Sequence, residues 1–259
     1  MTVSIAAVGR HGRMDLAFAR RNERTVIRHS YCEVPFKITR LFDEDAHGFA
    51  HLILMQCTAG LFGGDEIECS IRVEAGARVL LTQQSATKIH PSGGLPAIQR
   101  MRIVVESGAV LAANFEPVIP FADSRLHQWT HIELQPGASL VYWEGLMAGR
   151  VGKDECWRFR ELMSEARIEM AGRPIFLDRF LLDPLRANPE SRWIAGNAGY
   201  LGTGICIREG AASLMDSMHE AMPDAGVDVL GPDMLAVRLS TDAGPEFHRC
   251  RERFLSLAM

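Results

Sequence analysis

The chain has 259 residues, a formal net charge of −4 and six cysteines that form no CxxC pair. Its length is enough to bury a hydrophobic core without disulfides, its scattered cysteines argue against a zinc ribbon, and its interspersed charges argue against a nucleic-acid-binding face. Because it also lacks a run of about 18 apolar residues that would span a bilayer, we expect a soluble cytoplasmic protein whose partners are other proteins.

The first distinctive segment is CTAGLFGGDEIE, from Cys57 to Glu68, in which three glycines precede an acidic pair. A phosphate-binding loop would need a Lys-Ser/Thr pair and a helix after the glycines. The segment IECSIRV follows instead, and its alternating apolar and polar residues are typical of a half-buried strand. We therefore interpret Gly63 and Gly64 as part of a turn between strands, because glycine supplies the positive φ that such turns need.

A weak internal repeat runs through the middle of the chain. The segments IRVEAGARVLL, IVVESGAVLAA and IELQPGASLVY each contain a strand, a polar corner, a Gly-Ala pair and another strand. The pairs begin at Gly76, Gly108 and Gly137, so the intervals are 32 and 29 residues, which is typical of stacked supersecondary units. The gaps leave no room for the crossover helix of a parallel α/β sheet. The pattern predicts an all-β fold, either a solenoid-like stack of short strands or a sandwich.

Helical periodicity occurs mainly near the C-terminus, in AASLMDSMHEAMP and GPEFHRCRERFLSLAM, with a short predicted strand, DMLAVRLS, between them. We interpret the apolar stripe of each helix as a core-facing surface. These stripes are Leu214, Met215, Met218 and Met222, and then Phe247, Cys250, Phe254 and Leu257. The segment Asp183–Ser191 is the candidate hinge. We expect a single domain over residues 1–259, with a β stack over about 1–210 and a mixed helix and strand part over about 211–259.

One short motif suggests catalysis. The segment SATK, from Ser85 to Lys88, matches the S-x-x-K pattern in which a lysine activates a serine nucleophile. That chemistry requires the two residues to lie one turn apart on a helix, whereas the preceding residues are typical of a strand. A strand-to-loop junction is therefore favoured, and a Ser/Lys-type hydrolase remains the alternative.

Two histidine pairs have a spacing that would suit a metal on a helix, His47 with His51 and His127 with His131. The segment RLHQWTHIEL alternates like a strand, where residues four apart are separated by roughly 13 Å and do not share a metal ion. We expect structural or solvent-exposed roles for these histidines, and a solvated loop for the acidic run at 43–45. The residues alone indicate a cytosolic all-β protein without a visible active site, such as a binding scaffold.

Taken in order, several segments resemble the urease accessory protein UreD (UreH) family. They are RTVIRHSYCEVPFKITRLF, TAGLFGGD, GARVLLTQQSATKIHPS, GAVLAANFEPVIPFADSR, GASLVYWEGLMAGR and GRPIFLDRFLL. No single segment is diagnostic, but their order and spacing are. The resemblance implies a β-helix-like fold with two C-terminal helices and no catalytic activity, and it makes the G-L-x-G-G-D segment part of the β framework.

The resemblance also implies a function in urease maturation. Members of the family bridge apo-urease to UreF, which docks the nickel-carrying GTPase UreG, and a 2:2 complex with UreF is expected. No cofactor is expected to be tightly bound, but nickel is expected in transit through internal tunnels. The candidates for tunnel or partner contacts are Asp65, Glu66, Gln84, Thr87, Lys88, Glu116, Glu144, Arg150 and Asp178. A generic β-solenoid adaptor unrelated to urease remains a further alternative.

Overall fold

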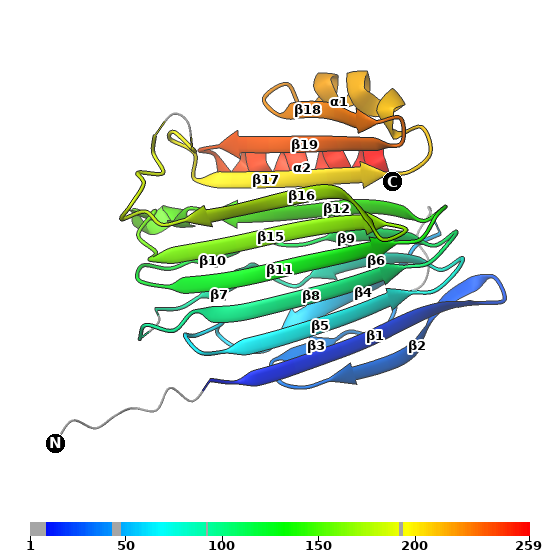
Figure 1. Cartoon of the computed structure of the whole chain (residues 1–259), viewed down its shortest axis with the longest axis horizontal. Helices are drawn as coiled ribbons and strands as arrows, with labels where there is room; N and C mark the ends of the chain where they lie inside the picture. The colour runs from blue at the N-terminus through cyan, green and yellow to red at the C-terminus, as the bar shows by residue number, and fades with distance from the viewer. Residues whose placement is uncertain (1–8, 43–47, 92, 192–193) are drawn as a thin grey trace.

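Two β-sheets face each other in the computed structural model, which describes residues 9–42, 48–91, 93–191 and 194–259 (Figure 1). The first, sheet A, has the strand order β16-β15-β11-β8-β5-β1-β2. Its strands are β1 (His11–Arg21), β2 (Arg24–Cys32), β5 (Glu66–Val73), β8 (Ala97–Val105), β11 (Arg125–Leu134), β15 (Glu161–Met170) and β16 (Arg173–Leu182). Hydrophobic side chains from both sheets fill the space between them and form the larger core.

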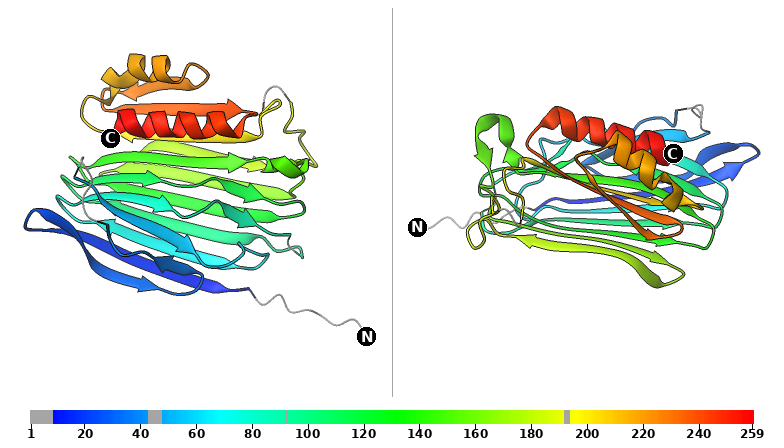
Figure 2. Two further views of the ribbon diagram at one scale, coloured as in Figure 1. Left: turned by 180° about the vertical axis from the view of Figure 1, so that it is seen from behind. Right: turned by 90° about the horizontal axis from the view of Figure 1, so that it is seen from above.

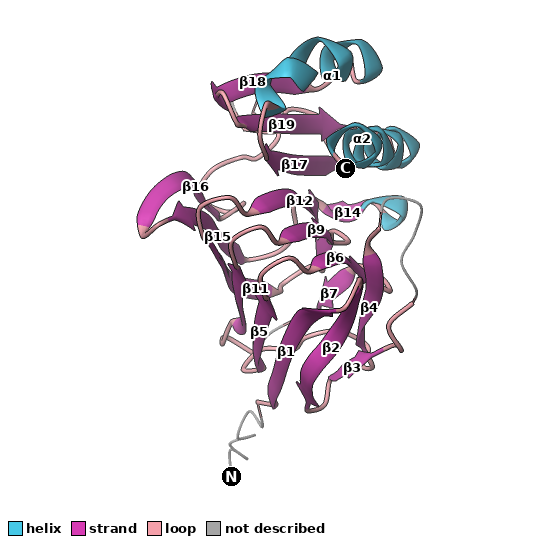
Figure 3. Cartoon of the chain, turned by 90° about the vertical axis from the view of Figure 1, so that its right-hand side faces the viewer, coloured by secondary structure: helices cyan, strands magenta, loops and turns pink. Residues whose placement is uncertain are grey.

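The second, sheet B, has the order β18-β19-β17-β12-β9-β6-β4-β3, and β7 and β10 pair beside this path. Its strands are β3 (Phe36–Ile38), β4 (Ala50–Gln56), β6 (Arg78–Gln83), β7 (Thr87–Ile89), β9 (Val110–Asn114), β10 (Val118–Pro120), β12 (Ser139–Met147), β17 (Tyr200–Ile207), β18 (Gly226–Gly231) and β19 (Met234–Thr241). A small ribbon of β13 (Gly149–Arg150) and β14 (Glu155–Cys156) flanks the short helix η1 (Val151–Lys153). Figure 3 shows the two sheets on opposite sides of the interior.

The repeat in the sequence forms the corners of a β-solenoid. The chain passes from sheet A to sheet B at Gly76, Gly108 and Gly137, whose φ angles are 73°, 70° and 81°. Strands β5, β8, β11 and β15 pair in parallel on one side of these corners, and β4, β6, β9 and β12 pair in parallel on the other. The alanine after each glycine is buried beneath its corner. The prediction of a solenoid-like stack is confirmed.

Antiparallel hairpins close sheet A at both edges. At one end β2 turns back along β1, and at the other β16 turns back along β15. The segment Asp183–Ser191, predicted as a hinge, belongs to the connection that then carries the chain from β16 to β17 in sheet B.

Sheet B continues past the end of sheet A through β17, β19 and β18, which are antiparallel to one another. The sequence predicted only β19 in the C-terminal part, and β18 was missed. Strand β18 is short, begins and ends with glycine, and buries only Val227. Its alternation was therefore too weak to indicate a strand.

The two predicted C-terminal helices are present and cover the outer face of sheet B at the end formed by β17, β19 and β18 (Figure 2). They are α1 (Met215–Ala221), preceded by the short helix η2 (Ala211–Leu214), and α2 (Gly244–Ala258). In α2, Phe247 and Phe254 pack on Trp143 with ring centroids 5.8 and 5.6 Å apart. The predicted apolar stripes of both helices face the core. Their buried residues are Met218, Met222, Phe247, Cys250 and Phe254, and their partly buried residues are Leu214, Met215 and Leu257. No helix in the described part of the chain is both long and apolar enough to cross a bilayer.

Candidate functional site: a polar seam between the two sheets

Strand register sorts the inner face of sheet A into rows of like residues. One row is aliphatic, and it consists of Leu16, Ile71, Ile103, Ile132 and Ile168. A polar row lies two inward-facing positions closer to the start of these strands. It consists of Gln99, Gln128 and Ser164, which stand side by side on β8, β11 and β15. The Gln128 side-chain amide donates to the Ser164 hydroxyl over 2.8 Å. Polar groups on three adjacent strands are thus aligned within an otherwise apolar interior.

Sheet B presents a matching row across the interior. Its β12, β17 and β19 carry Glu144, Thr203 and Arg238 at the same register. Arg238 donates to the Thr203 hydroxyl over 2.8 Å and to Asp178 of β16 over 2.6 Å. We refer to these groups together as the polar seam, which comprises Gln83, Gln99, Gln128, Glu144, Ser164, Asp178, Thr203 and Arg238.

Three cavities follow the polar seam. The first and middle cavities share Gln83, Thr87 and Gln99 in their walls, and the middle and third cavities share Gln128 and Glu144. The middle cavity is narrow, about 30 Å³, which leaves room for only a few water molecules, whereas the third measures about 360 Å³. The shared walls place the cavities in series through the interior, with Glu144 at the junction of the middle and third.

Glu144 is the central charged group of this series. Burial raises the pKa of its carboxyl, the charge on Asp178 raises it further, and the Tyr142 hydrogen bond and the Arg238 charge partly oppose the rise. The Tyr142 hydroxyl donates to Glu144 Oε2 over 2.6 Å, and burial raises the pKa of this tyrosine well above its usual value. A carboxyl held in this way gains from a cation nearby, because an opposite charge favours its ionised form.

The glutamines add oxygen atoms to this environment. The Oε1 atoms of Gln99 and Gln128 are buried, and neither accepts a hydrogen bond from the described groups. Amide and carboxylate oxygens, together with water, are ligands that suit hydrated divalent cations. The seam therefore offers a cation several weak oxygen contacts and the Glu144 carboxylate, while the second carboxylate, Asp178, is bound by Arg238.

Comparison with known proteins gives the chain a family. The model of the family described as UreD urease accessory protein matches residues 10–259. The chain belongs to the UreD family. A UreD urease accessory protein of Acetivibrio thermocellus is 36% identical over 70% of this chain and 70% of its own length. The UreD proteins of Sorangium cellulosum (33% identical, 83% of this chain and 67% of its own length) and Deinococcus radiodurans (32%, 82% and 76%) are also similar. These relatives are named as accessory proteins rather than as enzymes.

The acidic pair of the UreD-like segment TAGLFGGD lies away from the seam. Asp65 is buried and holds the glycine turn closed, because its carboxylate accepts from the backbone N–H groups of Arg10 at 3.0 Å and Phe62 at 2.8 Å. Gly64 has a φ of 86°, and Gly63 lies in the same turn, which confirms the turn predicted there. Glu66 lies on the outer face of sheet A, 3.6 Å from Arg100.

The segment with the S-x-x-K motif is a bend between β6 and β7. Ser85 is exposed in the bend and Lys88 is exposed on β7, so the helical turn required by a Ser/Lys hydrolase is absent and that alternative is wrong. Thr87 is buried and lines the first and middle cavities. Gln84 is exposed and, like Lys88, borders the first cavity, whereas the neighbouring Gln83 lines both the first and the middle.

The remaining UreD-derived candidates divide between the seam and other contacts. Glu144 and Asp178 belong to the seam. Glu116 lines the middle cavity and also binds Arg251 of α2, with 2.8 Å between Oε1 and Nη1. Arg150 is exposed, pairs with Glu155, and lies 4.6 Å from the centre of the Phe121 ring. The structure therefore places Arg150 away from the seam.

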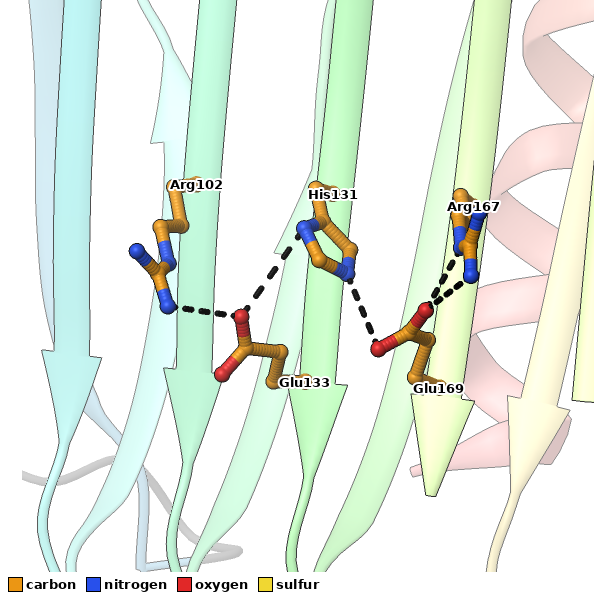
Figure 4. Close-up of polar contacts among 5 residues, drawn as sticks. All are labelled: Arg102, His131, Glu133, Arg167 and Glu169. Atoms are coloured by element: carbon orange, nitrogen blue, oxygen red, sulfur yellow. Dashed lines mark hydrogen bonds and ion pairs between the residues drawn. The ribbon is translucent and has the colours of Figure 1, made fainter. Parts of the chain in front are cut away.

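The histidine pair of β11 lies on the outer face of sheet A. His127 Nε2 is 2.5 Å from Glu161, while His131 stands between Glu133, 3.8 Å from Nδ1, and Glu169, 3.4 Å from Nε2 (Figure 4). Each histidine thus has its own carboxylate partners, which agrees with the separation expected for residues four apart on a strand. Among the described residues, no group of three or more His, Cys, Asp or Glu side chains would hold a metal ion. His47 and the acidic run at 43–45 lie outside the described residues.

Most of the seam was missed from the sequence. The residues not predicted are Gln83, Gln99, Gln128, Ser164, Thr203 and Arg238, together with Tyr142 beside them. A signal for two of them exists in the repeat. Gln99 and Gln128 are 29 residues apart, the same interval as Gly108 and Gly137, so both occupy one position of the repeat unit.

Proposed function

We propose that the chain is a non-enzymatic urease maturation factor that assists nickel insertion into apo-urease, with the polar seam as the path for nickel. Membership of the UreD family supports the role in urease maturation. The observation that carries the path is the series of three cavities, in which the middle cavity shares Gln83 and Gln99 with the first and Gln128 and Glu144 with the third. Nickel is cargo in this proposal and no resident cofactor is needed.

The chemistry of the seam suits transfer better than storage. A path for an ion must bind it well enough for entry and weakly enough for exit. Glu144 supplies one negative charge, and the glutamine and serine side chains supply neutral oxygens around it. The described residues that line the middle and third cavities include no histidine or cysteine, which would hold a nickel ion more strongly than these oxygens do, and of the three cavities Cys69 lines only the first.

The bridging role has support in exposed apolar side chains in and after β16. Leu181 and Leu185 are 60% and 72% exposed, and Ile194, which lines the third cavity, is 45% exposed. A group of exposed apolar side chains is typical of a protein interaction site. In this proposal these residues form the docking surface through which the chain would join apo-urease to UreF and the GTPase UreG, in the 2:2 assembly expected with UreF.

A substitution at Glu144 tests the path separately from docking. The Glu144→Gln variant keeps the size of the side chain and its acceptor for Tyr142 but removes the charge. Expressed with the urease subunits and the other accessory proteins, it should yield assembled urease with fewer nickel ions per active site, while UreF still co-purifies with the variant. The matched control is Glu133→Gln on the outer face of sheet A. Urease fully loaded by the Glu144→Gln variant would contradict the path.

A further inference from the structure

A row of sulfur atoms lies beside the polar seam, on the inner face of sheet A. Met14, Cys69 and Met101 stand on the adjacent strands β1, β5 and β8, where Met14 pairs with Cys69 and Cys69 with Met101 (Figure 1). All three are buried, and all three line the first cavity. Adjacent strands are about 4.8 Å apart, so the side chains of three such neighbours are able to converge on one small ion.

The chemistry of this row selects one class of metal. A thiolate and two thioethers are soft ligands, which favour Cu(I) over harder ions. Charge gives an independent reason, because one Cu(I) ion with one Cys69 thiolate is neutral, whereas a divalent ion there would leave an uncompensated positive charge in the interior. We propose that Met14, Cys69 and Met101 form a binding site for a single Cu(I) ion.

Binding at this site involves no change of oxidation state. Copper enters as Cu(I), the S–H bond of Cys69 breaks, its proton passes to solvent, and a Cu–S bond forms. The two thioether sulfurs donate electron pairs to copper, and no bond of the methionine side chains breaks. The first cavity also borders the exposed residues Gln84 and Ser85 of the β6–β7 bend and Lys88 of β7, which gives an ion a route from the surface.

The same residues do not suit the common alternatives. A disulfide between Cys69 and Cys32 would have to cross β1, since both cysteines pair with Met14. Two strand spacings amount to roughly 9.6 Å, beyond the reach of a disulfide. Zinc sites use thiolate, imidazole and carboxylate ligands, and Cys69 is the only such group among the three.

A second sulfur pair provides a matched control. Cys250 Sγ lies 3.5 Å from Met222 Sδ, equally buried but between the helices and the outer face of sheet B. Neither Cys250 nor Met222 lines any of the three cavities. Cys250→Ser therefore removes a buried thiol of similar environment without touching the proposed site.

The test is a titration of the full chain with Cu(I) under anaerobic conditions against the chromophoric chelator bathocuproine disulfonate. The exposed thiol of Cys57 is removed by Cys57→Ser in every sample. We expect one tightly bound Cu(I) that Cys69→Ser abolishes and Cys250→Ser retains. Met14→Leu and Met101→Leu, which keep the side-chain volume, should each weaken binding by about tenfold or more. X-ray absorption of the complex should show three sulfur neighbours.

Three results would overturn the site. The first is a folded Cys69→Ser variant that binds Cu(I) as tightly as the parent does. The second is an equal loss of Cu(I) affinity in Cys69→Ser and Cys250→Ser. The third is an X-ray absorption spectrum that shows nitrogen or oxygen neighbours of copper in place of sulfur. If Cys69→Ser does not fold, unchanged Cu(I) affinity in both methionine variants overturns it as well. None of these measurements involves urease or nickel, so the site and the nickel path fail or stand separately.

Discussion

Arg238 of β19 donates a hydrogen bond to Asp178 of β16, and this contact joins the last strand of sheet A to the part of sheet B that extends beyond it. The Nη1–Oδ2 distance is 2.6 Å, and the same guanidinium also donates to Thr203. The contact therefore bridges the two sheets at one end of the polar seam.

Removing this contact should loosen that end of the molecule. We expect Arg238→Ala to lower the free energy of unfolding by about 1 kcal/mol, a modest loss because the arginine side chain is 51% exposed and its ion pair is partly screened. Urea denaturation measures the loss. The matched control is Arg186→Ala, whose ion pair with Asp183 is more exposed and should contribute almost nothing. Equal losses in the two variants would contradict the role of the Arg238 contact.

Two glycines should respond very differently to alanine. At Gly108 an added Cβ meets no atom within 4 Å, so Gly108→Ala carries only the backbone cost of positive φ, about 1–2 kcal/mol. At Gly60, where φ is 141°, the Cβ would lie 2.3 Å from the Lys88 carbonyl oxygen. Gly60→Ala should therefore prevent folding or destabilise the chain far more. Thermal melts of both variants compare them, and equal melting temperatures would count against this account.

A β-branched residue at a corner should cost more than alanine. Gly76, Gly108 and Gly137 all have positive φ. Valine at any one of these corners should strain the backbone by roughly 1–3 kcal/mol. We expect Gly108→Val to lower the yield of soluble complex with UreF, because the corner connects β8 of sheet A to β9 of sheet B. Valine variants at all three corners that match the parent in stability would show that the positive φ carries no cost.

Glu144 should make the protein less stable as the pH rises. Its folded-state pKa is raised, chiefly by burial, so the native state holds the proton more tightly than the unfolded state does. Stability then falls as pH rises from the unfolded pKa through the folded pKa. Glu144→Gln should remove this dependence, matching the parent in acid and exceeding it at neutral pH. Chemical denaturation across pH 4 to 8 gives the comparison.

Glu169 provides the opposite sign. Burial works to raise the pKa of its carboxyl, but the hydrogen bonds and charges of Arg167 and His131 lower it overall (Figure 4). Its contribution to stability is present above the unfolded pKa and is lost as pH falls through the folded pKa. Glu169→Gln should thus weaken the protein at neutral pH and not in strong acid. If Glu144→Gln and Glu169→Gln changed the stability in the same direction at neutral pH, the opposite pKa shifts assigned to the two carboxyls would be refuted.

Ser85 should be dispensable. It is exposed in the β6–β7 bend, and Lys88 lies on β7 rather than one helical turn away, as a Ser/Lys-type nucleophile requires. We expect Ser85→Ala to support urease activation as well as the parent does, measured as urease activity after co-expression. Labelling of the parent by a serine-reactive phosphonate, absent in Ser85→Ala, would instead reveal a nucleophile.

The sequence predicted the features that repeat locally and missed those that depend on register. Gly76, Gly108 and Gly137 recur at near-constant intervals, and the solenoid corners follow from them. Alternation within IECSIRV, which forms most of β5, also indicated which of its residues face inward. Which strand lies beside which is a tertiary property, so the alignment of Gln128 with Ser164, 36 residues away, was not visible.

The C-terminal half of the seam was harder still. Asp178, Thr203 and Arg238 lie on β16, β17 and β19, which are outside the repeat and run antiparallel to their neighbours. Their spacing in the sequence carries no period. Asp178 was proposed only because it lies in a segment that resembles UreD, and Gln84 borders the first cavity, whereas the neighbouring Gln83, which was not proposed, borders both the first and the middle.

The hairpins at the two edges of sheet A set the length of the molecule. A stack of parallel coils has no intrinsic end, since each coil offers the next a complete set of backbone groups, and open stacks of this kind can polymerise. Here β2 and β16 reverse direction and present an antiparallel edge where a further coil would have to dock in parallel. Arg173 and Arg179 also place charge along the outermost strand. The two hairpins therefore prevent further coils from adding at either edge of sheet A, so that the stack does not extend into a filament.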